Sequence, residues 1–157
     1  MSTSRSGFDI TPLSKDRVTA LASDLTPEER RVILQQGTER AFCGVFLDNK
    51  KDGVYCCRLC GLPLFRSSHK FDSGTGWPSF FATYDDAHVR TIRDTSYGMI
   101  RTEIVCARCG SHLGHVFPDG PPPTGARHCL NSVSLSFTEQ GQPLPDLLGR
   151  GEAKLAD

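Results

Sequence analysis

The sequence predicts a mainly β protein that begins with a short helical segment. Two observations indicate this fold class. Signals for the start of a helix are concentrated in the first 40 residues, where Ser14 and Thr26 each precede a short run with helical character. From Gly53 onward, short apolar runs recur between turns that contain Gly or Pro, which is typical of strands.

The 157 residues are expected to form a single domain that buries its core without help. We divide this domain, 1–157, into a helical N-terminal segment (1–40), a β body (41–137) and a surface tail (138–157). The tail is placed at the surface because it has few large apolar residues. It resembles the loosely packed ends that many domains carry.

Two helices are expected in the N-terminal segment. Ser14 caps the first. The second begins at Thr26-Pro27-Glu28-Glu29, which combines an N-cap, a proline at the first helical position and a capping box. This helix is predicted to run to about Gln36 and to end at Gly37.

The β body is predicted from short apolar runs. Residues 40–46 are expected to be extended, and Asp52-Gly53 to form a turn before a short strand at Val54 and Tyr55. The other expected strands are residues 62–65, 99–105, 115–117 and 132–137. In the last run, apolar residues alternate with serines, which is the period of a half-buried strand.

Charge and hydropathy argue against several function classes. Lys and Arg (18) balance Asp and Glu (18), so no overall field favours nucleic acid or an anionic membrane. No apolar stretch approaches the length of a membrane span, and residues 1–8 do not resemble a leader. We therefore expect a cytoplasmic protein with no nucleic-acid or membrane partner. In a reducing compartment, its seven cysteines are more often metal ligands or catalysts than structural disulfides.

Four of the cysteines form two Cys-x-x-Cys-Gly units, in which the Gly permits a tight turn. The four are Cys57, Cys60, Cys106 and Cys109. Together they offer the four sulfurs that suit one tetrahedral zinc ion. A site closed by four thiolates has no open position, so the zinc is expected to be structural. The alternatives are a redox Cys-x-x-Cys and two unrelated turns.

The cysteines outside these units are Cys43, Cys56 and Cys129. Cys56 is next to a ligand and is expected to pack. Cys129 follows a loop rich in Pro and Gly and has Arg127 and His128 before it; cationic neighbours favour the reactive thiolate. The alternative for Cys129 is a buried, inert cysteine. A reactive thiol and a second thiol that can reach it make a redox catalyst that forms a sulfenic acid and then a disulfide.

Two other stretches are candidates for a pocket. Trp77 is the only tryptophan and stands on a Gly-rich turn next to Pro78, where its indole face can hold a small apolar group. The alternative for Trp77 is core packing. His112 and His115 follow the second Cys-x-x-Cys unit, and Gly114 can kink the strand and bring them together. Their alternative is a metal ligand or a buried structural histidine.

These residues together resemble the B class of methionine sulfoxide reductases, the enzymes specific for the R epimer of the sulfoxide. The resemblance covers about residues 53–137. Besides the two Cys-x-x-Cys units, it includes Gly-Trp-Pro-Ser-Phe at 76–80, His-Leu-Gly-His-Val-Phe at 112–117, Asp-Gly-Pro at 119–121 and Arg-x-Cys-x-Asn at 127–131. It implies a fold of two antiparallel sheets with a helical N-terminal segment, a structural zinc, and a role in repairing oxidative damage.

The resemblance also implies a role for each site residue. Cys129 attacks the sulfoxide sulfur and becomes a sulfenic acid, and Arg127 favours its thiolate. Trp77 holds the substrate's methyl group, and Phe80 completes the substrate site beside it. His112, His115 and Asn131 bind the sulfoxide oxygen and assist its protonation.

The sequence departs from the family in two places. The residue before the nucleophile is commonly Tyr and is His128 here, and a common position of the resolving cysteine is Thr75 here. We therefore predict that Cys43 attacks the Cys129 sulfenic acid and that thioredoxin reduces the disulfide. Cys56, or direct reduction of the sulfenic acid, is the alternative. The substrate is free or protein-bound methionine sulfoxide, and the protein is expected to be a monomer.

Three other functions compete with this one. The first is a zinc-stabilised binding module, and the second is a relative of this fold that only binds partners. The third is a zinc enzyme that uses His112 or His115 as a ligand at an open position. Metal content and the effect of Cys129→Ser discriminate among them.

Overall fold

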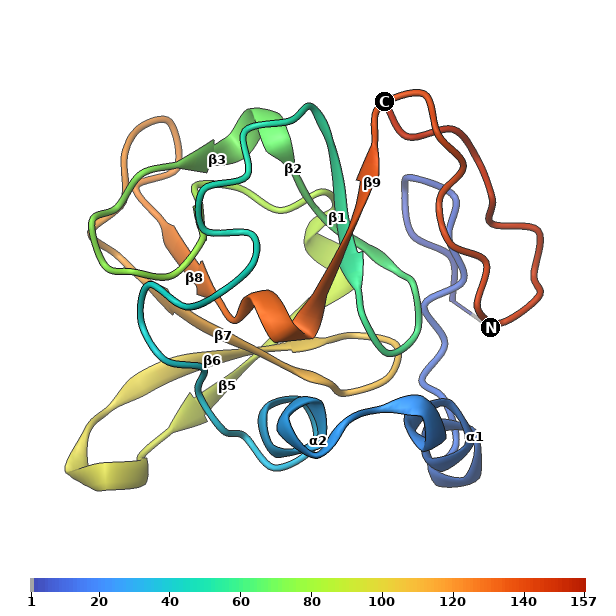
Figure 1. Ribbon diagram of the computed structural model, residues 1–157, viewed down its shortest axis with the longest axis horizontal. Helices are drawn as coiled ribbons and strands as arrows, with labels where there is room; N and C mark the ends of the chain where they lie inside the picture. The colour runs from blue at the N-terminus through green and yellow to red at the C-terminus, as the bar shows by residue number, and fades with distance from the viewer. Residues whose placement is uncertain (1) are drawn as a thin grey trace.

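The computed structural model describes residues 2–157. Within this range the chain forms two short α-helices and nine strands, arranged in two antiparallel sheets (Figure 1). The helices are α1 (Lys15–Leu21) and α2 (Pro27–Ile33). The strands are β1 (Gly53–Cys57), β2 (Pro63–Arg66), β3 (Lys70–Phe71), β4 (Ser79–Phe80), β5 (Val89–Asp94), β6 (Arg101–Cys106), β7 (His112–Phe117), β8 (Arg127–Leu130) and β9 (Leu135–Glu139).

The smaller sheet has the strand order β2-β1-β9, and the larger has the order β3-β4-β8-β7-β6-β5. Every strand pair in both sheets is antiparallel. The predicted fold class is therefore confirmed: mainly β, with two antiparallel sheets and a short helical N-terminal segment. In Figure 1 the two helices lie together on one side of the molecule, and α2 lies next to β7.

Both predicted helix starts are confirmed. The Ser14 side chain accepts a hydrogen bond from the backbone of α1, and the capping box of Thr26 and Glu29 is complete in α2. The second helix ends at Ile33, earlier than predicted. Val32 and Ile33 are buried but the next residues are exposed, so no apolar face continues. Gln36, rather than Gly37, takes the left-handed conformation, at a φ of 58°.

Two other predictions of local structure are wrong. Residues 40–46 form turns instead of an extended segment, because Phe42 has a positive φ and its N–H donates to the carbonyl of Gly76. The alternating run at 132–137 is not one strand. Ser132–Ser134 form a 3₁₀ turn, and the strand β9 begins only at Leu135. The turn carries the chain from the larger sheet to the smaller one, and its serines are buried, with Ser134 Oγ donating to the carbonyl of His112.

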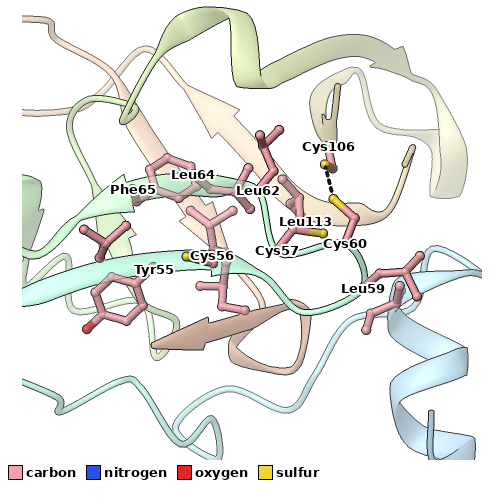
Figure 2. Close-up of a cluster of buried hydrophobic side chains, with 14 of the residues drawn as sticks. Tyr55, Cys56, Cys57, Leu59, Cys60, Leu62, Leu64, Phe65, Cys106 and Leu113 are labelled. Atoms are coloured by element: carbon pink, nitrogen blue, oxygen red, sulfur yellow. Dashed lines mark hydrogen bonds between the residues drawn. The ribbon is translucent and has the colours of Figure 1, made fainter. Parts of the chain in front are cut away.

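The core lies between the two sheets and is shown in part in Figure 2. Its aromatic centre is made by Tyr55 of β1, Phe65 of β2 and Phe80 of β4, all with no exposed area. The rings of Phe65 and Phe80 stack with their centres 4.7 Å apart, and Tyr55 meets Phe80 edge-on at 5.1 Å. This contact joins the smaller sheet to the strand that pairs with β8.

The last residues run beside the N-terminal segment (Figure 1). Leu144 and Ala156 are buried in the core, so the surface segment 138–157 is anchored to the body at more than one point. Within residues 2–157, no helix has both the length and the apolar character that crossing a membrane requires.

Candidate active site and metal centre

The four predicted metal ligands come together in the structure. Cys57 ends β1 and Cys60 stands on the turn that follows it, while Cys106 ends β6 and Cys109 stands on the turn that follows. All four Sγ atoms lie within 4.8 Å of one another. The Sγ atoms of Cys57 and Cys109 are 3.5 Å apart, and those of Cys60 and Cys106 are 3.6 Å apart. Sulfurs bound at about 2.3 Å to a tetrahedral zinc ion are about 3.8 Å apart, so the cluster fits such an ion.

The backbone of both turns follows from the glycines. Gly61 and Gly110 have positive φ values of 84° and 76°. Each donates its N–H to the carbonyl of the first cysteine of its unit, Cys57 or Cys106. This closes the turn that aims two sulfurs at one point. The cluster thereby links a hairpin of the smaller sheet to a hairpin of the larger one (Figure 2).

Cys129 lies on β8 and lines a cavity of about 290 Å³. Its neighbours β4 and β7 hold it on both sides, and its Cα is paired with those of Ser79 and His115. Thr75 Oγ1 is 3.7 Å from Cys129 Sγ, and Ser79 Oγ donates to the same sulfur at 4.0 Å. The strand pairing on both sides holds Cys129 rigidly, and its partial exposure leaves the thiol open to a ligand.

Trp77 also lines this cavity. Its Nε1–H donates to the carbonyl of Glu39 at 3.0 Å, which fixes the ring from one edge. Phe80 does not lie at the cavity. It is fully buried in the core between Tyr55 and Phe65, so we assign it to packing in place of the expected contact with substrate.

The two histidines lie close together on β7, with ring centres 5.6 Å apart. Each donates to a carboxylate: His112 Nδ1 to Glu103 at 2.7 Å, and His115 Nε2 to Asp94 at 2.8 Å. Burial lowers the pKa of His115, and its bond to Asp94 partly offsets this effect. His115 borders the Cys129 cavity, whereas His112 borders the adjoining cavity.

Arg127 and Asn131 also line the Cys129 cavity. Arg127 binds both carboxylate oxygens of Asp119, at 2.9 and 3.2 Å, and its guanidinium lies 4.4 Å from the ring centre of Phe117. Asn131 Oδ1 accepts the N–H of Glu39 at 3.0 Å, and its Nδ2 donates to the carbonyl of Leu113 at 3.3 Å. These two bonds fix the amide of Asn131 at the wall of the cavity, and its contact with the sulfoxide oxygen stays a prediction.

Comparison with known proteins agrees with this geometry. Residues 25–139 match the SelR domain family. A peptide methionine sulfoxide reductase MsrB of Xylella fastidiosa (strain M23) is 63% identical over 145 residues, covering 92% of this chain and 94% of the relative. An MsrB of Caulobacter vibrioides (strain NA1000 / CB15N) is 59% identical over 149 residues, covering 95% of this chain and 94% of the relative. The chain belongs to the MsrB family of peptide methionine sulfoxide reductases.

Within this MsrB fold, Cys43 lies in the turns that follow the N-terminal segment, and it is exposed. It is not among the residues that line the Cys129 cavity. The preceding residue, Phe42, is bonded to Gly76, next to the Thr75 that contacts Cys129. Cys56 is fully buried, and burial raises the pKa of its thiol, so it is suited to packing and not to nucleophilic attack.

The sequence did not reveal several residues of this MsrB site. Glu39 holds both Trp77 and Asn131 through its backbone, and no side-chain pattern predicts such a contact. Asp94 and Glu103 lie on the paired strands β5 and β6. In the sequence, charged residues that alternate along a strand indicate a side that faces solvent, so neither carboxylate was expected at the site. The pairing of β6 with β7 sets Glu103 opposite His115, and its carboxylate accepts from His112.

Proposed function

We propose that this protein reduces the R epimer of methionine sulfoxide, free or in oxidised proteins, to methionine. The observation that carries the proposal is the cavity shared by Cys129, Trp77 and His115. It offers a nucleophile, an apolar ring and a proton-bearing group within one small space. The family membership supports the same chemistry.

In the proposed reaction the Cys129 thiolate attacks the sulfoxide sulfur while a proton is delivered to the sulfoxide oxygen. The S–O bond of the substrate breaks, and the oxygen leaves with the cysteine as a sulfenic acid. The substrate sulfur gains two electrons and becomes a thioether, and the Cys129 sulfur loses two. Arg127, which borders the cavity, stabilises the thiolate before attack.

The roles of the other residues follow from their placement. Trp77 packs its ring against the methyl group of the substrate. His112 and His115 supply the proton and bind the oxygen as charge develops on it. Cys57, Cys60, Cys106 and Cys109 hold one zinc ion, which supplies structural stability and, with four thiolates around it, offers no position for substrate.

We further propose that Cys43 attacks the sulfenic acid, releasing water and forming a Cys129–Cys43 disulfide that thioredoxin reduces. The segment at 41–44 has to approach the cavity for this step, since a disulfide needs Cα atoms within about 7 Å. The bond from Phe42 to Gly76 supports this route, because it already holds the segment beside the turn that contacts Cys129. The exposure of Cys43 also leaves it free to react.

Steady-state assays with each epimer and thioredoxin test the reaction. The wild type is expected to form methionine from the R epimer and not from the S epimer, and Cys129→Ser to form none. Turnover of the S epimer by the wild type, or of either epimer by Cys129→Ser, would contradict the proposal.

The resolving step is tested by Cys43→Ser, with the buried Cys56→Ser as its matched control. In a single turnover Cys43→Ser is expected to form methionine at the normal rate. With thioredoxin it is expected to lose multiple turnover, while Cys56→Ser keeps it. Normal turnover of Cys43→Ser with thioredoxin would show that the sulfenic acid is reduced by another route.

A further inference from the structure

Glu39 is a buried acid in the irregular segment between α2 and β1. It is 4% exposed, although Thr38 and Arg40 on either side of it are exposed. Acidic side chains are rarely buried unless they are bound to a partner, so the burial of this one indicates a specific contact. Thr38 lines the Cys129 cavity and Glu39 does not, so the Glu39 side chain lies behind the wall of that cavity.

The side chain of Glu39 is bound to the 3₁₀ turn that follows β8. Its Oε1 accepts the N–H of Val133 at 2.9 Å. The backbone N–H of Glu39 donates to Asn131 Oδ1 at 3.0 Å. Residue 39 is therefore held at two points against residues 131–133, once through its side chain and once through its backbone.

The carbonyl of Glu39 holds the substrate site. It accepts the Nε1–H of Trp77 at 3.0 Å. An indole has a single hydrogen-bond donor, so this contact is the one polar bond that the ring can donate. Trp77 lines the Cys129 cavity and is half-buried. The position of the Glu39 backbone thus decides where the ring lies in the cavity.

The carboxylate is also enclosed by the segment that carries Cys43. Its Oε2 is buried and has no hydrogen-bond partner among residues 2–157. Gly44 packs against this oxygen, since a Cβ at residue 44 would collide with Glu39 Oε2 and with Ser132 Oγ. The carboxylate therefore fills a closed space, and Gly44 keeps it turned towards Val133.

We propose that Glu39 is a positioning residue for Trp77. Its carboxylate fixes the backbone that holds the indole, and the position of the indole sets the affinity for the methyl group of the sulfoxide. This inference rests on the proposed function. The group that matters is the acceptor at Oε1, because Val133 N–H is a neutral donor and burial disfavours the charged form of the acid.

The test uses Trp77 as its own probe, because it is the only tryptophan and intrinsic fluorescence reports on this ring alone. Glu39→Ala removes the bond to Val133. In single turnover with dabsyl-methionine-R-sulfoxide, we expect half-saturation to need about 3- to 10-fold more substrate, the part of the affinity that a misplaced aromatic ring loses. The rate constant at saturating substrate is expected to stay near the wild-type value. Without substrate, the emission is expected at longer wavelength and acrylamide to quench it more strongly.

Two variants separate positioning from a loss of stability. Glu39→Gln keeps an acceptor at Oε1 and is expected to show the half-saturation and emission of the wild type. Glu152→Ala is the matched control, because it also removes a buried carboxylate, one that is bound to Arg108 instead of the site. It is expected to lose stability without changing either measurement.

Three results would overturn the inference. The first is a Glu39→Ala protein with wild-type half-saturation and emission, the second is the same change in Glu152→Ala, and the third is Glu39→Gln that behaves as Glu39→Ala. Wild type that forms no methionine would instead refute the proposed function, and the emission of the same variants would still show whether Glu39 holds Trp77.

Gly44→Ala keeps the inference testable if Glu39→Ala does not fold. The added methyl group pushes on Oε2 and removes no polar group. We expect half-saturation to rise about twofold or more, with the same direction of change in emission. In a Trp77→Phe background, which has no indole N–H, Gly44→Ala is expected to add no further rise. A fully multiplicative rise in the double variant would overturn the inference, because the effect would then not pass through the indole.

Discussion

At the scale of single residues, Trp77 is fixed at one edge and presents its ring to the cavity. The hydrogen bond from its Nε1 to Glu39 ties the indole to the N-terminal segment. Trp77→Phe removes this bond but keeps an aromatic face, whereas Trp77→Ala removes both. Aromatic packing contributes about 0.5–1.5 kcal/mol beyond buried area, so we expect Trp77→Ala to raise KM for the sulfoxide about tenfold or more. Trp77→Phe is expected to raise it less. Equal KM values in all three proteins would show that the ring does not hold the substrate.

His128 is a second residue whose surroundings lead to a prediction. Burial lowers its pKa, partly offset by the bond from Nδ1 to the carbonyl of Phe80. The unfolded chain therefore binds a proton more readily than the fold does, and stability is lost as pH falls below about 6.5. We expect the free energy of unfolding to fall between pH 7.5 and pH 5.5, by at most about 1.4 kcal/mol per pH unit from this group. In His128→Gln the decline should be shallower, and urea unfolding at each pH measures it. An identical decline would assign the effect to other groups.

At the scale of elements, the metal cluster joins two hairpins that belong to different sheets. The β1–β2 hairpin supplies Cys57 and Cys60, and the β6–β7 hairpin supplies Cys106 and Cys109. Metal binding is coupled to stability wherever the ligands are brought together only by folding. We expect one zinc ion per chain by metal analysis, and a melting temperature that falls by 10 °C or more after chelation, for a loss of about 2–4 kcal/mol. A metal-free protein with an unchanged melting temperature would contradict a structural role for the cluster.

The helices, strands and turns also show which local structures the sequence predicts and which it does not. The capping box of α2 and the two Cys-x-x-Cys turns are local, since all their contacts lie within a few residues, and they were predicted correctly. The run at 132–137 was not, because serines that alternate with apolar residues are typical of a strand with one solvent-facing side. In the fold Ser132 and Ser134 are buried and hydrogen-bonded, and the chain crosses between sheets at that turn. Strand β5 was missed because its central residues are all exposed and two of them, Arg90 and Arg93, are charged.

The residues of the candidate site likewise fall into those that the sequence predicts and those that it does not. Cys129, Trp77 and His115 were selected from residue type and motif, and the fold brings them to one cavity. Glu103 and Glu39 could not be selected, because their roles depend on strand pairing and on backbone contacts across the chain. Phe80 was misplaced because the motif that contains it gives no sign of which face of β4 it occupies.

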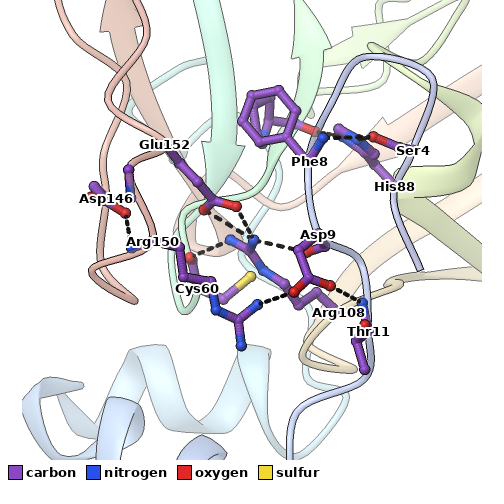
Figure 3. Close-up of polar contacts among 12 residues, drawn as sticks. Ser4, Phe8, Asp9, Thr11, Cys60, His88, Arg108, Asp146, Arg150 and Glu152 are labelled. Carbon is purple, nitrogen blue, oxygen red and sulfur yellow. Dashed lines mark hydrogen bonds and ion pairs between the residues drawn. The ribbon is translucent and has the colours of Figure 1, made fainter. Parts of the chain in front are cut away.

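At the scale of the whole molecule, the two ends of the chain are fastened to the metal turn by one arginine (Figure 3). The Arg108 side chain has no exposed area, and its Nη1 donates to both oxygens of Glu152, at 3.0 and 2.8 Å, and to the carbonyl of Asp9 at 3.1 Å. Its Nη2 donates to the carbonyl of Cys60 at 2.8 Å. The guanidinium therefore connects the N-terminal segment, the C-terminal segment and the cluster.

Removing one partner of such a pair leaves a buried charge without compensation. We expect Glu152→Ala to lower the free energy of unfolding by about 3–5 kcal/mol. The neighbouring Arg150–Asp9 pair is partly exposed, so Arg150→Ala is a control that should lower the free energy of unfolding much less. Urea unfolding of the two variants gives the comparison. Equal losses would show that the buried pair is no more important than the exposed one.

The central claim for the whole molecule is that one cysteine takes the oxygen of the substrate as a sulfenic acid. A second cysteine then attacks this sulfenic acid and forms a disulfide. The most direct measurement incubates the reduced protein with one equivalent of dabsyl-methionine-R-sulfoxide and no reductant, and then counts methionine formed and thiols lost. We predict one methionine for two thiols, with Cys129 joined to Cys43 in the peptide map. One methionine for one thiol would contradict the resolving role of Cys43, and no methionine would contradict the reductase function itself.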